Sequence, residues 1–145
     1  PMSNDPLLQP FQLKHLTLRN RIMTTSHEPA YGDDGMPKDR YRLYHLERAK
    51  AGVAMVMTAG SASVSRDSPP VFSNLLVWKD EVVPWMKRLT DDCHAAGAAV
   101  MSKLHRQYRS RSHPIQSRLA MAALLQPSML EAIMARTVSR HTEQQ

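Results

Sequence analysis

The chain has 145 residues, of which 42% are hydrophobic and 22% are charged, which is typical of one soluble globular domain and too small for most two-domain enzymes. No stretch approaches the roughly 18 consecutive apolar residues of a membrane-spanning helix, and the first residues lack the basic and apolar regions of a secretory signal, so a cytoplasmic protein is expected. The single cysteine, Cys93, excludes an internal disulfide and a cysteine-ligated metal cluster.

The net charge of +6 is concentrated in the C-terminal part of the chain. Residues 1–101 carry a net charge of +1, whereas residues 102–145 carry +5 and contain only two acidic residues. A basic, acid-poor segment occurs in nucleic-acid-binding arms, and it also occurs in solvated or poorly ordered tails, which is the simpler interpretation.

The first predicted elements in chain order are a short hairpin and a buried strand. Apolar residues alternate through "FQLKHLTL" (11–18), and a buried strand is expected near residues 21–25. This strand ends in the polar run "TTSH" (24–27), which is poor core material because each buried polar atom needs a partner. We therefore expect the polar run to line a binding site.

Two helices and two further buried strands are predicted between residues 31 and 101. In order, they are a turn at 31–37, a helix over 37–51, a strand that begins at Val53 and ends in "TAGS" (58–61), a helix over about 80–96, and a strand that begins with "AAVM" (98–101). Apolar strands that alternate with helices indicate parallel strands and an α/β fold. Ligands of such folds bind at the carboxyl ends of strands, where both "TTSH" and "TAGS" are expected.

The periodicity also predicts which helical residues are buried. In the helix over 37–51, the expected apolar stripe is Leu43, Leu46 and Ala49. His45 and His94 are expected at the surface or between helices, and Cys93 is expected to be a small buried hydrophobe.

The pattern changes after residue 101. Residues 102–118 have neither helix nor strand period and are expected to be loop or disordered, and the segment from Leu119 onward is expected to form one or two short helices broken at Pro127. The predicted division is therefore 1–101 and 102–145. Two origins of the second part stay open: a reading-frame change or damaged gene copy, or a short natural protein whose tail covers the sheet with helices.

Several motifs occur together in residues 6–101: "TLRNRI", a polar strand end with His27 and Tyr31, "DRYRLYHLERAKAG" and "AGSASVSRDSP". In this combination the chain resembles the N-terminal part of old yellow enzyme-like NADH:flavin oxidoreductases, in particular the members that demethylate dimethylglycine or N-methylproline. The resemblance ends after the third barrel strand. It implies a partial TIM (β/α)8 barrel with the first three parallel strands and two helices, an irregular or helical C-terminal tail, and FMN as cofactor.

The resemblance also implies which residues line the flavin: Thr25, Ser26 and His27 after the first strand, and Ala59 after the second. Small residues suit this place, because a planar ring on a strand end needs close backbone approach and donors near its N5 and O4 atoms. Glu28 stands where relatives with covalent flavin have a cysteine, which implies a non-covalent cofactor. Ser102 stands where the family has a flavin-binding Gln, and Lys103 places a charge in the expected barrel interior.

His27 and Tyr31 each have two interpretations at this stage. His27 either contacts the flavin or a substrate carboxylate, or it satisfies a local backbone group. Tyr31 is either an aromatic wall over a bound ring or an ordinary half-buried loop residue.

Two functional hypotheses follow. The first is an FMN-dependent oxidoreductase that transfers a hydride, with oxidative demethylation of an N-methylated amino acid as the candidate reaction and a small-molecule substrate as partner, rather than nucleic acid or a membrane. Because the family's later substrate-binding and phosphate-binding parts have no counterpart, a truncated and inactive chain is expected, and no catalytic residue or metal ligand is assigned. The alternative is a non-enzymatic binding module whose basic tail binds nucleic acid or a partner protein.

Overall fold

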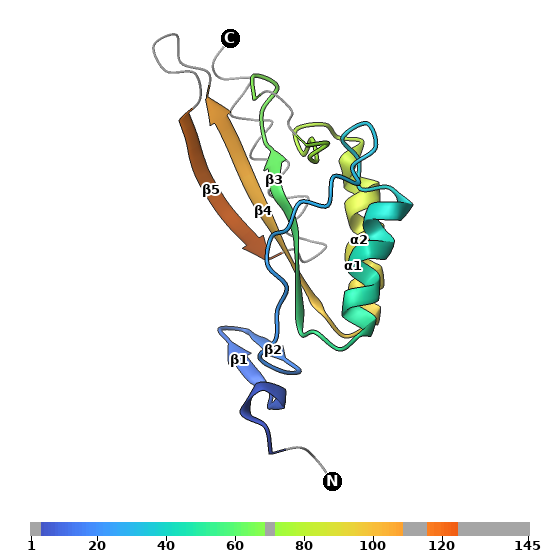
Figure 1. Cartoon of the computed structure of the whole chain (residues 1–145), viewed down its shortest axis with the longest axis vertical. Helices are drawn as coiled ribbons and strands as arrows, with labels where there is room; N and C mark the ends of the chain where they lie inside the picture. The colour runs from blue at the N-terminus through green and yellow to red at the C-terminus, as the bar shows by residue number, and fades with distance from the viewer. Residues whose placement is uncertain (1–3, 69–71, 109–115, 125–145) are drawn as a thin grey trace.

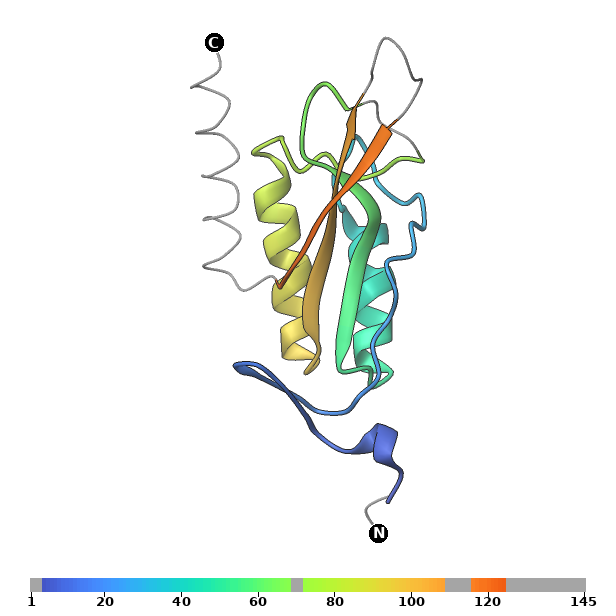
Figure 2. The same ribbon diagram turned by 90° about the vertical axis from the view of Figure 1, so that its left-hand side faces the viewer.

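The computed structural model describes residues 4–68, 72–108 and 116–124. Its elements are a 3-10 helix Pro6–Leu8, β1 Phe11–Leu13, β2 Leu16–Leu18, α1 Asp39–Lys50, β3 Met55–Ser63, α2 Val82–Ala95, β4 Ala99–Tyr108 and β5 Gln116–Leu124. The helices α1 and α2 pack against one face of the sheet β3-β4-β5, and the hairpin β1–β2 lies at the end where β3 and β4 begin (Figure 1). Figure 2 shows the chain after β2 running along β3 toward the other end of the sheet.

The predicted α/β fold is confirmed as a partial barrel. The helices expected over 37–51 and 80–96 are α1 and α2, and the hairpin expected in residues 11–18 is β1–β2. β3 and β4 pair in parallel, with Met55 opposite Ala99. The buried strand expected near residues 21–25 is wrong in extent and in burial, because it is reduced to one parallel bridge, from Met23 to Met55, and Met23 is 46% exposed. The segment around Met23 still runs parallel to β3 and β4.

Residues 102–124 differ from the prediction. The expected irregular segment is wrong for residues 102–108, which extend β4 to Tyr108 across the predicted boundary at residue 101. It is also wrong for residues 116–118, and the expected helix is wrong for residues 119–124, because residues 116–124 form β5 antiparallel to β4, with Ser102 opposite Ala123. Backbone pairing with a free sheet edge does not depend on the side-chain pattern, so a segment without a strand period can still pair there. The predicted break at Pro127 lies outside the described residues.

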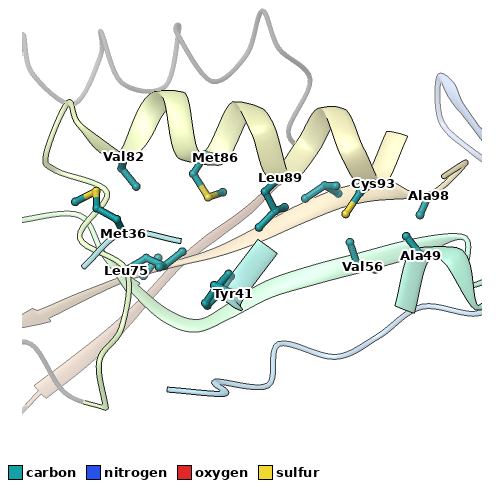
Figure 3. Packing of buried hydrophobic residues seen from close by; sticks show 12 residues of the cluster. Met36, Tyr41, Ala49, Val56, Leu75, Val82, Met86, Leu89, Cys93 and Ala98 are labelled. Atoms are coloured by element: carbon teal, nitrogen blue, oxygen red, sulfur yellow. The ribbon is translucent and has the colours of Figure 1, made fainter. Parts of the chain in front are cut away.

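The hydrophobic core lies between the two helices and the sheet (Figure 3). From α2 it receives Val82, Met86, Leu89 and Cys93, whose spacing of three and four residues places them on one helix face. The predicted burial of Cys93 is confirmed, and burial raises the pKa of its thiol to about 12.

α1 buries a different face from the one predicted. Its buried residues are Tyr41, His45 and Ala49, whereas Leu43 is 44% exposed. The assignment of Leu43 to the core stripe is therefore wrong, whereas that of Ala49 is confirmed. Of the two places expected for His45, the surface is excluded, because its side chain is buried. Tyr41 and Ala49 both belong to the core cluster, and a residue midway between them on the same face must also point inward.

The segment after β2 ties the hairpin to the ends of both helices. Arg19 Nη1 donates a hydrogen bond to the carbonyl of Ala96 (2.9 Å), and Nη2 donates to the carbonyls of Ala49 (2.6 Å) and Val53 (2.7 Å). The last carbonyls of a helix have no partner inside the helix, and a guanidinium can satisfy several of them. The first arginine of the "LRNR" motif therefore links the hairpin to the helix ends, at the end of the sheet where the strands begin.

Candidate functional site

The polar run 24–27, which we call the rim segment, lies directly beside β3. The backbone N–H of Thr24 donates to the carbonyl of Met55 (3.0 Å), and the N–H of Met57 donates to Thr24 Oγ1 (3.0 Å). A tight turn follows, in which the N–H of His27 donates to the carbonyl of Thr25 (2.8 Å). The hydroxyl of Thr24 therefore extends the hydrogen bonding between this segment and β3. The turn at residues 25–27 then leads the chain away from β3.

The structure brings Thr25 and His27 together in one cavity lining, whereas Ser26 and Ala59 are not part of that lining. Thr25 and His27 are exposed and Ser26 is half-buried. Ala59 lies within β3 rather than after it, so the expectation that "TAGS" follows the second strand is wrong. The strand continues because Ala62 and Ser63 resume pairing with β4 after a register irregularity that begins at Thr58, which is the signature of a bulge.

Ser102 lies on the face of the sheet that the helices cover. It is buried, and Thr58 Oγ1 donates a hydrogen bond to its hydroxyl (3.0 Å). Thr58 and Ser102 are opposite partners in the ladder, and they share their strand face with Val56 and Val100 of the helix-covered core. Lys103, the next residue of β4, therefore points to the opposite face of the sheet.

A cavity of about 330 Å³ lies between the rim segment and α1. It is lined by Met23, Thr24, Thr25, His27, Tyr44, His45 and Arg48. Of the four predicted site residues it contains Thr25 and His27. The contribution of α1 to this cavity was not predicted, although the spacing of four from Tyr41 to His45 to Ala49 indicates one inward helix face.

His45 is an unusual member of this lining. Its side chain is 1% exposed, and neither ring nitrogen has a hydrogen-bond partner among the described residues. Burial and, to a smaller extent, the positive charge of Arg48 together lower its pKa from 6.5 to about 4, so the imidazole is neutral at pH 7. Its ring packs against those of Tyr41 and Tyr44, with centroids 4.9 and 5.1 Å away.

Arg48 is held in place over the ring of Tyr44. Its guanidinium carbon lies 3.4 Å from the ring centroid, and Nη1 donates to the Tyr44 carbonyl (2.7 Å). A guanidinium has five N–H donors, so further donors remain for another acceptor. The cavity therefore combines a fixed cation with a neutral, buried imidazole.

Among residues 4–68, 72–108 and 116–124, no three His, Cys, Asp or Glu side chains gather in a way that could hold a metal ion. Within those ranges, no helix has the length and apolar character needed to cross a bilayer.

Parallel strands with helices on one face and a polar rim at one edge define part of a (β/α)8 barrel. The profile of the NADH:flavin oxidoreductase / NADH oxidase family matches residues 6–142. The chain belongs to this family. The match extends beyond residue 101, where the resemblance in the sequence was expected to end.

The chain is similar to parts of two longer relatives. It is 68% identical over 103 residues to the probable N-methylproline demethylase of Rhizobium meliloti, which covers 71% of this chain and 15% of the relative. It is 48% identical over 102 residues to the multifunctional alkene reductase/demethylase OYE of Caballeronia cordobensis, and this match covers 70% of the present chain and 15% of the relative. The chain thus spans about 15% of the length of these curated relatives.

Solved structures share the fold. The old yellow enzyme from Trypanosoma cruzi gives a TM-score of 0.63 at 19% identity and covers 72% of this chain and 28% of its own. Morphinone reductase in complex with tetrahydroNAD gives a TM-score of 0.63 at 14% identity. This match covers 94% of the present chain and 47% of the morphinone reductase chain. At these identities the likeness establishes the barrel fold.

Proposed function

We propose that the chain carries part of the FMN-binding wall of a flavin-dependent oxidoreductase, with Thr25, Ser26, His27 and Ala59 as the residues that contact the flavin. The main support is the pair of 3.0 Å hydrogen bonds that hold Thr24 against Met55 and Met57 of β3. One flat ring can touch the rim segment and β3 together only if these two segments are neighbours.

The groups at the rim fit a flavin chemically. The hydroxyl of Thr25 and the imidazole of His27 are exposed, and both can donate hydrogen bonds to ring oxygen and nitrogen atoms. The register irregularity around Ala59 releases backbone groups from the ladder, and such groups commonly serve ligands. When bound, FMN would supply the ability to accept or donate a hydride, while these residues hold and orient it.

We propose an N-methylated amino acid as the substrate class. The support is the 68% identity to a relative named a probable N-methylproline demethylase and the 48% identity to one named an alkene reductase/demethylase. We further propose that the 145 residues alone do not catalyse the reaction, because the described part forms only one wall of a site that a complete barrel encloses. The family match through residue 142 favours this function over a binding module built on the basic tail.

Fluorescence quenching of FMN by the purified chain tests the proposal. We expect saturable, non-covalent binding whose Kd rises by about three- to tenfold in T25V and in H27A, because each change removes one hydrogen-bond donor. The matched control is T17V, which alters an exposed threonine on the hairpin. Absence of binding by the wild-type chain, or equal Kd values for all four proteins, would contradict the proposal.

Turnover is measured separately with the FMN-loaded chain. We expect NADH oxidation and N-methylproline demethylation at the rate of free FMN. A rate well above that of free FMN would show that 145 residues suffice for catalysis.

A further inference from the structure

One lysine of β4 lies on the face of the sheet opposite the two helices. Along β4, Val100 belongs to the core beneath the helices, whereas Ala99 and Met101 pack with the hairpin residues in a second cluster. Successive side chains of a strand alternate between its two faces, so Lys103 continues the row of Ala99 and Met101. The ammonium group therefore belongs to the face of the sheet that α1 and α2 do not cover.

Lys103 also lies at the level of the rim segment along the sheet. Its neighbour Ser102 is opposite Thr58 of β3, and the rim segment is joined to β3 where the N–H of Met57 donates to Thr24 Oγ1 (3.0 Å). The rim segment, β3 and β4 are thus neighbours in this order, and two strand spacings amount to about 10 Å. A flat ligand of three fused rings that touches the rim segment and β3 extends toward Lys103.

The charge of Lys103 is not balanced by a carboxylate within residues 4–68, 72–108 and 116–124, where no ion pair includes this residue. Lys103 is half-buried, the preceding residues of its row are apolar, and its own position is opposite Ala122 of β5. A cation in such surroundings loses part of its hydration and gains no opposite charge in return. The position therefore favours a ligand that carries or acquires negative charge.

We propose that Lys103 sets the reduction potential of the bound flavin by placing its positive charge beside the ring. The inference rests on the proposed function. A hydride carries two electrons and one proton, so its transfer to the neutral oxidised ring leaves a reduced ring with one negative charge, which a fixed cation stabilises. Ser102 cannot serve in this way, because it lies on the helix-covered face and accepts a hydrogen bond from Thr58.

The test measures the reduction potential of FMN bound to the full chain, by equilibrium titration against a redox dye of known potential. In K103M we expect the Kd of oxidised FMN to stay within about threefold of the wild-type value, because the oxidised ring is neutral. The Kd of reduced FMN should rise about tenfold, which lowers the two-electron potential by about 30 mV. The matched control is K87M, which removes an equal charge from an exposed lysine of α2.

Two further variants separate the charge of Lys103 from its shape and its hydrogen bonds. K103R keeps the positive charge and should keep the wild-type potential. K103Q keeps hydrogen-bond donors without the charge, so its potential should fall as far as that of K103M. Urea denaturation of each variant shows whether it is folded, and K103Q replaces K103M in the comparison if the apolar side chain prevents folding.

Three results would overturn the inference: a wild-type potential in K103M and K103Q, an equal loss of potential in K103R, or an equal weakening of oxidised and reduced FMN in K103M. The last result would make Lys103 an ordinary binding contact. Absence of FMN binding by the wild-type chain would contradict the proposed function and this inference with it. Normal FMN binding with an unchanged potential in the neutral variants would contradict this inference alone.

Discussion

The helices α1 and α2 cover the same sheet, but they bury different chemistry. α2 buries an almost wholly apolar stripe, which includes Met86 and Leu89. α1 buries Tyr41, His45 and Ala49, and its single buried imidazole has no hydrogen-bond partner among the described residues. α2 therefore acts to hold the fold together, whereas α1 also builds the wall of a site.

The largest expected effect tests the stabilising role of α2. Leu89 is fully buried, so L89A should lower the free energy of unfolding by about 4 kcal/mol through lost transfer energy and the cavity left behind. The matched control is L43A on α1, where the leucine is 44% exposed and the change should stay below about 0.5 kcal/mol. Urea denaturation measures both. Similar losses for the two variants would remove the distinction between the helices.

The next effect sharpens the role of α1. The pKa of His45 is about 4 in the folded chain and 6.5 without the environment of the fold, so the unfolded chain binds more protons between these two pH values. Stability should therefore be complete above pH 6.5 and fall by about 3 kcal/mol as the pH decreases to 4. Denaturation curves at several pH values measure this loss.

The variants H45Q and H94Q complete the pH experiment. H45Q should lack this component of the pH dependence, whereas H94Q, which alters an exposed histidine, should retain it. A pH dependence that is the same in H45Q and in the wild-type chain would mean that His45 does not titrate as its burial requires.

The smallest effect concerns what joins the two helices at their C-terminal ends. R19M removes hydrogen bonds to the carbonyls of Ala49, Val53 and Ala96 and should cost about 2 kcal/mol. R21M, which removes an exposed guanidinium that lies over Phe11, should cost less than about 1 kcal/mol. Thermal unfolding of both variants provides the comparison, and equal midpoints would show that Arg19 does not join the helices.

The sequence predicted the parts of the fold whose periodicity coincides with burial. The range of α2 and the burial of Cys93 were predicted, because apolar residues of this helix recur at helical spacing. The residue range of α1 was predicted correctly, but its buried face was not, because the inward face carries His45 while an exposed position carries Leu43. A pattern of apolar residues cannot identify a buried position that is occupied by a polar residue.

The candidate site was predicted in part for a similar reason. The polar run at Thr25 and His27 was found because small hydroxyl residues after a strand are unusual core material. The contribution of Arg48 was not found, because contact between a strand end and a helix is a property of packing. The strand β5 was missed because pairing along a free edge depends on backbone groups and not on side-chain alternation.

The irregular stretch of β3 has a consequence for how this surface changes over evolutionary time. Between Thr58 and Ala62, β3 advances four residues while β4 advances two, from Ser102 to Leu104. Substitutions at residues 59–61 leave the β3–β4 pairing intact on either side, so this stretch can change without a large loss of stability. We therefore expect substitutions in this stretch to alter the proposed flavin contact at Ala59 more than they alter the stability of the fold.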